Sequence, residues 1–252
     1  RARRSPRSSA WRATRCNRSA AANISELVST LLIKRSGLSR VQPLLVLAEA
    51  DDCAAVRAAG AGYLPVSGLH YGSVFDPSLQ DVDLNAWDAS LLWSPAEYSK
   101  LWVMDCLLMN HDRYSSHGNA RLTPPAEYNG KWRLVAVDQS DCFFGAEYLS
   151  SGTFTAKCAE NKPVPWPVPL LAPIHDHGIA SVNMAINSAR GAVDNHLDQI
   201  VDSVPEEWWA QAGVDPRDVL RCLRDRAKRL ADIVNVQMLQ GIKGATDGGV
   251  VI

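Results

Sequence analysis

An apolar helix, a polar loop and a short hairpin follow one another without interruption between residues 94 and 138. The helix is expected over residues 94–109, because Ser94 can cap it and Pro95 suits the first helical position. Glu97 would complete a capping box with Ser94. Helical spacing predicts a buried face made of Leu101, Met104, Leu107 and Leu108. The following loop is therefore expected to leave the C-terminal end of a core helix.

The loop itself, residues 110–119, reads NHDRYSSHGN and holds Asp, Arg, two His and two Asn between apolar runs. Two short strands are predicted next, at 120–122 and 132–137, with Asn129 and Gly130 in the tight turn of a hairpin. Asp138 directly follows the second strand. The hairpin would thus fix the separation between two carboxylates, Asp112 in the loop and Asp138 at its far end.

The rest of the chain predicts mostly helices with a little sheet. A helix is expected from Asn23, as its N-cap, to Gly37, with Glu26 as the second residue of a capping pair. The other expected elements are a strand at 41–50, an irregular connection at 60–88 and a long helix from Pro216 to about Leu239.

Composition narrows the function classes. The chain has 26 basic and 27 acidic residues, which gives no electrostatic case for nucleic acid or an anionic membrane as partner. No apolar run is long enough for a membrane span. The cysteines are Cys16, Cys53, Cys106, Cys142, Cys158 and Cys222. Their scatter argues against a zinc knuckle and a compact disulfide framework, so we expect reduced thiols in a cytoplasmic enzyme or binding domain.

The order of loop, hairpin and second carboxylate suits phosphoryl transfer. One carboxylate is needed near the acceptor hydroxyl to orient it and take its proton. An Asp and an Asn typically supply the hard oxygen ligands that hold magnesium against the phosphates of ATP. The residues at 110–138 therefore predict a phosphotransferase site.

Three segments also carry a family resemblance. The run DCLLMNHDR (105–113), followed by Asn119 and VAVDQSDCFF (135–144), resembles the catalytic and metal loops of the HipA-like kinases, distant relatives of protein and phosphatidylinositol kinases. SELVSTLLIKRSGL resembles the family's helix near the end of the small lobe. IVDSVPEEWW and VLRCLRDRAKRL resemble its C-terminal segment and last helix. The resemblance covers about residues 23–240 and is strongest at 101–144.

This resemblance implies an α+β, protein-kinase-like fold, with a mainly helical large lobe, a catalytic β-hairpin and a small lobe that is reduced or missing. Residues 1–22 would be a basic, disordered arm or a truncated stump, and residues 23–88 the remnant of the small lobe with its connection. The large lobe would span residues 89–240, followed by a flexible tail at 241–252.

The resemblance also implies roles for single residues. Asp112 would be the catalytic base and Arg113 the ion-pairing residue of the catalytic loop. Asn119 and Asp138 would hold magnesium, with Asn110 as an alternative amide ligand.

Other residues are assigned to the cofactor site. Glu26 would orient the lysine that binds the nucleotide phosphates. Asn110 and His117 would be the other cofactor-binding residues. The implied cofactors are ATP and Mg²⁺, and the implied partner is a phosphate acceptor, expected to be a hydroxyl group of a protein.

The sequence departs from the family pattern in three places. His117 stands where the family usually has its first Asn, and DQS replaces the usual Asp-His-Gly. No glycine-rich loop or lysine-bearing strand precedes Glu26. These departures favour the alternative of a catalytically inactive pseudokinase that binds a partner. Two weaker alternatives stay open, a lipid kinase and a metal-dependent hydrolase that uses Asp112, Asp138 and the pair His175 and His177.

Overall fold

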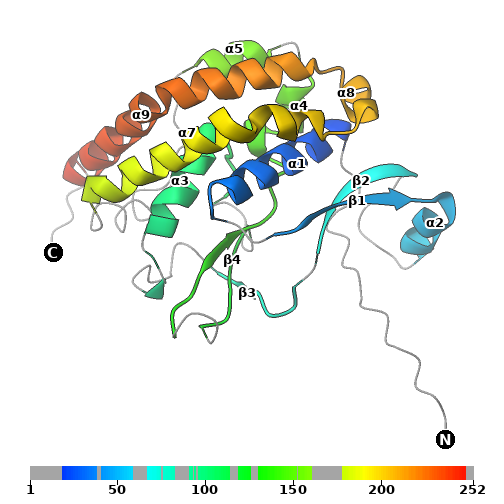
Figure 1. Cartoon of the computed structure of the whole chain (residues 1–252), viewed down its shortest axis with the longest axis horizontal. Helices are drawn as coiled ribbons and strands as arrows, with labels where there is room; N and C mark the ends of the chain where they lie inside the picture. The colour runs from blue at the N-terminus through cyan, green and yellow to red at the C-terminus, as the bar shows by residue number, and fades with distance from the viewer. Residues whose placement is uncertain are drawn as a thin grey trace, which may run out of the picture.

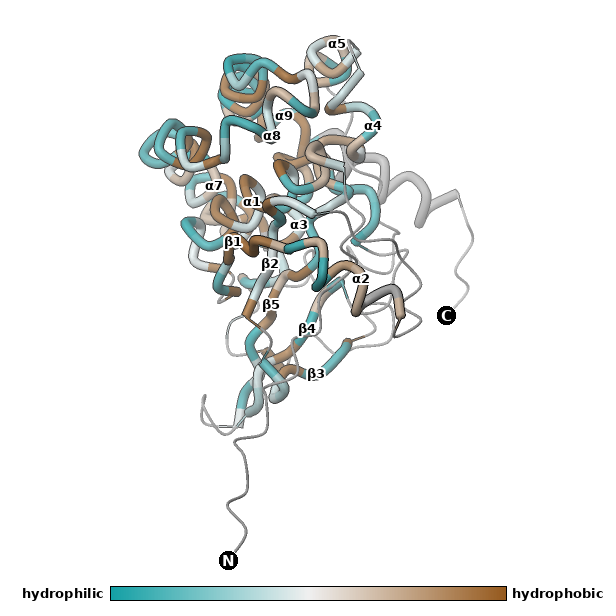
Figure 2. Tube along the Cα trace, turned by 90° about the vertical axis from the view of Figure 1, so that its right-hand side faces the viewer, coloured by the Kyte–Doolittle hydropathy of each residue, from teal (hydrophilic) through white to brown (hydrophobic). Residues whose placement is uncertain are grey.

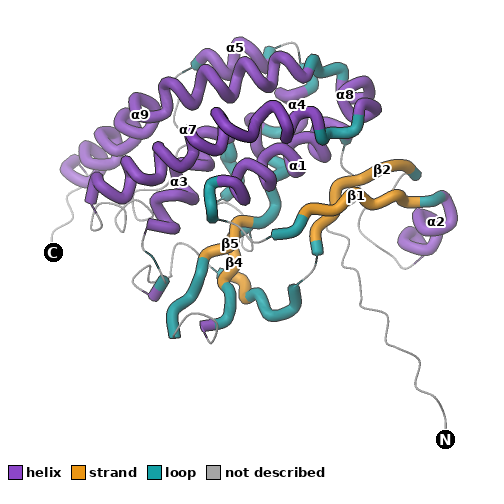
Figure 3. Tube along the Cα trace, in the orientation of Figure 1, coloured by secondary structure: helices purple, strands orange, loops and turns teal. Residues whose placement is uncertain are grey.

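The structure is a computed structural model of the 252-residue chain. It describes residues 19–38, 41–58, 67–74, 76–82, 91–92, 94, 96–113, 119–125, 130–151, 153–160 and 178–247. The described part is mainly helical and contains two small antiparallel sheets, which is consistent with the expected α+β class (Figures 1 and 3).

The described helices are α1 (Ala20–Arg35), α2 (Ala50–Ala58), α3 (Ala96–Leu108), α4 (Ala146–Leu149), α5 (Phe154–Ala159), α7 (Gly178–Asp202), α8 (Glu206–Ala212) and α9 (Pro216–Asp247), with a 3-10 turn η3 (Cys142–Phe144). One sheet pairs β1 (Pro43–Ala48) with β2 (Gly68–Ser73). The other has the order β3 (Gln80–Asp81), β4 (Ala120–Leu122) and β5 (Leu134–Ala136).

Helix α3 lies at the centre of the helical part. It packs against both α7 and α9, and α1 packs against α7 and α8. The predicted buried face is confirmed, because Leu101, Met104, Leu107 and Leu108 are all buried. Burial extends around the rest of the helix and includes the charged residue Asp105. A polar group in such surroundings requires a partner.

Helix α1 begins earlier than predicted. Its N-cap is Ser19, whose Oγ accepts a hydrogen bond from Ala22 N (3.4 Å), so the prediction of Asn23 as the cap was wrong. Asn23 is instead buried inside the helix, where its Oδ1 accepts from the backbone N of Tyr71 in β2 (3.2 Å). The helix ends as predicted, since Gly37 follows it at a φ of 80°.

Glu97 also has a tertiary contact in place of a predicted capping contact. Its carboxylate accepts from Arg133 Nε (2.6 Å) and from Leu134 N (2.9 Å). Leu134 begins β5, so this buried side chain ties the start of α3 to the hairpin.

The predicted hairpin is confirmed. Strands β4 and β5 pair antiparallel, with Ala120 opposite Ala136. The turn residue Asn129 lies outside the described residues, whereas Gly130 has a φ of 79°. The two strand ends that carry the loop and Asp138 therefore lie next to each other.

Two other expectations fail. Residues 60–88 were expected to be irregular, but they contain β2 and β3. The sequence of β2, GLHYGS, contains Gly68 and Gly72, and glycine is unfavourable in strands, so its sequence does not predict a strand. The strand is stabilised by its antiparallel pairing with β1. β1 itself appears as a brown, apolar stretch in Figure 2, and its Leu45 and Leu47 are exposed. Helix α9 continues to Asp247, beyond its expected end at about Leu239.

The cysteines correct a further expectation. Cys158 in α5 and Cys222 in α9 form a disulfide, so the prediction of reduced thiols was wrong for this pair. Their sequence separation is 64, and only the packing of α5 on α9 brings them together. Cys53, Cys106 and Cys142 are buried and take no part in this disulfide. Within the described ranges, no helix combines the length and apolar content that crossing a membrane requires.

Candidate functional site

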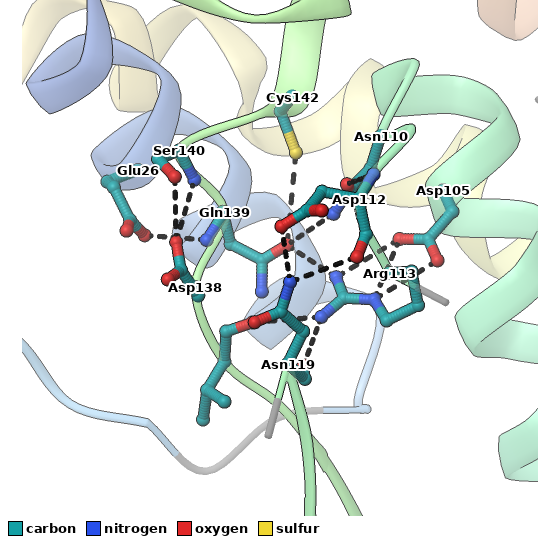
Figure 4. A network of polar contacts seen from close by, with 11 residues as sticks. Glu26, Asp105, Asn110, Asp112, Arg113, Asn119, Asp138, Gln139, Ser140 and Cys142 are labelled. Atoms are coloured by element: carbon teal, nitrogen blue, oxygen red, sulfur yellow. Dashed lines mark hydrogen bonds and ion pairs between the residues drawn. The ribbon is translucent and has the colours of Figure 1, made fainter. Parts of the chain in front are cut away.

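A network of polar contacts lies where the end of α3 meets the hairpin (Figure 4). Its labelled members come from α1, from α3 and the loop after it, and from the segments before β4 and after β5. They are Glu26, Asp105, Asn110, Asp112, Arg113, Asn119, Asp138, Gln139, Ser140 and Cys142. Six of the seven predicted site residues are among them, and the seventh, His117, lies outside the described residues.

Helix α3 ends in a left-handed turn that starts the loop. Met109 has a φ of 57°, and the N–H of Asn110 donates back to the carbonyl of Asp105 (3.0 Å), as in a Schellman motif. The Asn110 side chain is fully buried, and its Oδ1 accepts from the N–H of Asp112 (3.0 Å). Its Nδ2 donates to Gln139 Oε1 (3.5 Å). Asn110 therefore shapes the backbone that presents Asp112.

Arg113 pairs with Asp105 in the interior. Its Nε lies 3.1 Å from Asp105 Oδ2 and its Nη2 lies 3.1 Å from Oδ1, so the contact is a two-point fork. Both side chains are 0% exposed. Burial opposes the charge of the guanidinium, but the charge and hydrogen bonds of Asp105, together with smaller contributions from Cys142 and Asp138, raise the pKa of Arg113.

The same guanidinium reaches both strands of the hairpin. Its Nη1 donates to the carbonyl of Asn119, before β4, and to the carbonyl of Val137, after β5 (2.8 Å). Its Nη2 also donates to Gln139 Oε1 (2.7 Å). Arg113 thus joins the end of α3 to the two chain segments that carry Asn119 and Asp138.

Asp112 and Asn119 are in direct contact. Asn119 Nδ2 donates to Asp112 Oδ2 (2.8 Å) and to its backbone carbonyl (3.0 Å). Asn119 is buried, while Asp112 is half-buried. The backbone carbonyl of Asn119 accepts from Val137 N (3.1 Å). Asn119 therefore lies opposite Val137, the residue that precedes Asp138.

Asp138 has an unusual backbone. Its φ is 53°, in the left-handed region, and its side chain is half-buried. Asp138 Oδ1 accepts from Ser140 Oγ (2.7 Å) and from Ser140 N (3.4 Å). The next N–H, that of Gln139, donates to Glu26 Oε2 (2.8 Å). Asp112 and Asp138 are the two predicted site carboxylates with partly exposed side chains, whereas Glu26 is buried.

Some members of the network were given no role from the sequence. Asp105 could have been noticed, because it is an acidic residue within the apolar run LWVMDCLLM. Gln139 and Ser140 gave no such signal. Gln139 is 1% exposed, and its Oε1 also accepts from Cys142 Sγ (3.8 Å). Its Nε2 is buried without a hydrogen-bond partner among the residues that the structure describes.

His111 is the histidine that lies beside Asp112 in the loop. His111 packs against Phe144, with ring centroids 4.9 Å apart. Burial, and secondarily the charge of Arg226, lowers the pKa of His111. His175 and His177 lie outside the described residues, so the hydrolase alternative built on them stays a prediction. Across the described ranges, no group of three or more His, Cys, Asp or Glu residues could hold a metal ion.

The comparisons with known proteins find matches among solved structures. No model of a protein family matches the chain, and a search of curated proteins finds no match. Among solved structures, the proinflammatory kinase CtkA of Helicobacter pylori matches with 14% sequence identity and a TM-score of 0.44. The match covers 94% of this chain and 86% of that one.

Proposed function

We propose that the chain is a HipA-like kinase, which transfers the γ-phosphoryl group of ATP to a hydroxyl group of a protein. The supporting observation is that Asp112, Asn119 and Asp138 are grouped around the buried guanidinium of Arg113. Arg113 holds the backbone on both sides of the hairpin, and Asn119 Nδ2 holds the Asp112 carboxylate. Rigid placement of this kind is what phosphoryl transfer requires, because its catalysis is mostly positioning and electrostatics.

The donor atoms at the site fit magnesium. Asp138 offers carboxylate oxygens from a half-buried side chain, and the Asn119 amide oxygen is a second hard donor. Such a site has one carboxylate and one amide, so it differs from the clusters of three or more His, Cys, Asp or Glu residues that are absent among the described residues. Bound magnesium would neutralise the charge of the phosphate oxygens.

Asp112 is assigned to the acceptor. A half-buried carboxylate can hydrogen-bond the acceptor hydroxyl and take its proton as the oxygen attacks phosphorus. The new O–P bond forms while the bond between phosphorus and the β,γ-bridging oxygen breaks, and ADP leaves. Asn119 Nδ2, which donates to Asp112 Oδ2, would keep the other oxygen of the carboxylate turned toward the hydroxyl.

A turnover assay separates these roles. Incubation with magnesium and ATP, followed by mass spectrometry of the chain and added protein acceptors, should give phosphorylated residues. Asp112→Asn should reduce turnover by about 10²-fold or more while ATP binding persists, since it removes only the proton acceptor. Asp138→Asn should abolish both. Glu147→Gln removes an exposed charge on α4 and serves as the matched control, with turnover unchanged.

A partner-binding module without catalysis is the second candidate. It is favoured by the two hydrogen bonds from Ser140 that already engage Asp138 Oδ1. Equal residual activity in the wild-type chain, Asp112→Asn and Asp138→Asn would support this candidate over the kinase.

A further inference from the structure

Helix α1 and the Asp138 segment meet through one charge-assisted hydrogen bond. Glu26 Oε2 lies 2.8 Å from the backbone N of Gln139, at a sequence separation of 113. Glu26 is 5% exposed and Gln139 is 1% exposed, so water does not compete effectively for this contact. A carboxylate that accepts a buried N–H forms one of the stronger hydrogen bonds in proteins.

The contact between Glu26 and Gln139 constrains the backbone of Asp138. Asp138 has a left-handed φ of 53°, an uncommon conformation for a residue other than glycine, and it persists only when its surroundings hold it. The N–H of Gln139 belongs to the peptide group that directly follows Asp138. Fixing that N–H therefore fixes the ψ angle of Asp138, while Ser140 Oγ fixes its carboxylate.

We propose that Glu26 is a positioning residue for the metal-binding carboxylate of Asp138, acting through the backbone of Gln139. The proposal rests on the proposed function, since it takes Asp138 to be a magnesium ligand. It gives Glu26 a task distinct from the lysine-orienting role that the family resemblance implies. In this arrangement, the position of α1 governs the geometry of the metal site.

The chain offers a matched control for this role. Glu97 is also a buried glutamate, and it also accepts from a backbone N–H of the hairpin segment, that of Leu134 (2.9 Å). Its contact lies at the start of β5, whereas that of Glu26 lies beyond the end of β5, next to Asp138. Loss of either side chain removes a buried acceptor of a backbone N–H, and loss of Glu97 removes its ion pair with Arg133 as well, but only loss of Glu26 acts on the peptide group next to Asp138.

The test is Mn²⁺ affinity, measured by the electron paramagnetic resonance of free Mn²⁺ in the presence of the full chain. Glu26→Ala should weaken Mn²⁺ binding by about 10- to 100-fold, the usual effect of losing a residue that orients a metal ligand. Glu26→Gln keeps an acceptor oxygen and should stay close to wild type. Glu97→Ala should lower the unfolding midpoint but leave the Mn²⁺ affinity unchanged. Glu26→Asp, which keeps the charge but shortens the reach, replaces the alanine variant if the latter does not fold.

The possible results test the positioning role of Glu26 separately from the proposed kinase function. Wild-type affinity in folded Glu26→Ala or Glu26→Asp overturns the inference and leaves the kinase proposal intact. A wild-type chain that binds no Mn²⁺ overturns the proposed function, and amide hydrogen exchange at Gln139 then decides the inference. Slow exchange in the wild type and fast exchange in the Glu26 variant, with other core amides unchanged, supports the positioning contact. Equal exchange rates overturn it.

Discussion

The guanidinium of Arg113 and the carboxylate of Asp105 form an ion pair from which solvent is excluded, with 3.1 Å between Nη2 and Oδ1 and 0% exposure on both sides. Asp105 belongs to the central helix α3, and Arg113 continues from it to the carbonyl groups at both ends of the hairpin. The buried ion pair of Asp105 and Arg113 therefore connects the proposed site to the hydrophobic core.

Asp105→Ala should be among the most destabilising substitutions in the chain. It leaves the Arg113 guanidinium buried without its carboxylate, which typically costs about 3–5 kcal/mol. The measurement is the free energy of unfolding in urea. Asp218→Ala, which breaks the exposed pair of Asp218 with Arg221, should cost less than about 1 kcal/mol. Similar losses in the two variants would contradict a buried, essential pair.

Arg226→Met should also destabilise the fold. The buried Arg226 guanidinium donates to the carbonyls of Cys106 (2.6 Å) and Leu107 (3.3 Å) at the end of α3. Methionine keeps much of the apolar packing but removes these two hydrogen bonds, at a cost of about 1–3 kcal/mol each. Arg229→Met, at a half-buried position that contacts the end of α5, should cost less in the same unfolding experiment.

Reduction of the disulfide should lower stability. Cys158 and Cys222 close a loop with a sequence separation of 64, for which chain entropy alone gives about 4 kcal/mol. Unfolding in urea with and without a reducing agent measures the difference. The double variant Cys158→Ser with Cys222→Ser should be less stable and insensitive to the reducing agent. Thiol titration of the denatured wild type that gives the same count before and after reduction would contradict the bond.

His111 should make stability depend on pH. Burial lowers its folded pKa, whereas the unfolded pKa stays near the ordinary value of 6.5. Below about pH 6.5 the unfolded state binds the proton more readily, so stability is complete above this pH and falls as the pH drops toward the folded pKa.

The comparison of wild type with His111→Phe isolates this effect, since phenylalanine can keep the packing on Phe144. The difference in unfolding free energy between the two proteins should be constant above about pH 6.5 and shift against the wild type below it. A shift in favour of the wild type at low pH would contradict the buried, neutral imidazole.

Local patterns predicted the elements that carry the site. The apolar spacing of α3 and the turn signal near Gly130 gave the helix and the hairpin, because both are set by neighbours in sequence. The loop stood out because it concentrates charged and amide groups, and the roles of Asp112, Asn119 and Asp138 were implied by the family resemblance. Their grouping in the structure follows directly from the hairpin register.

Long-range contacts were not predictable in the same way. Glu26 and Glu97 both looked like helix-capping residues, yet each binds a backbone N–H that lies far along the chain. The disulfide between Cys158 and Cys222 depends on the packing of α5 against α9, which no spacing rule encodes. Gln139 is buried by the network around it, and glutamine carries no signal of burial.

The central claim is that Asp138 and its neighbours hold magnesium and ATP. Titration calorimetry of ATP into the full chain, with and without magnesium, tests it most directly when wild type is compared with Asp138→Asn. The account predicts saturable binding that requires magnesium and is lost in the variant. Absence of binding by a wild-type chain shown to be folded, or equal binding by Asp138→Asn, would contradict it.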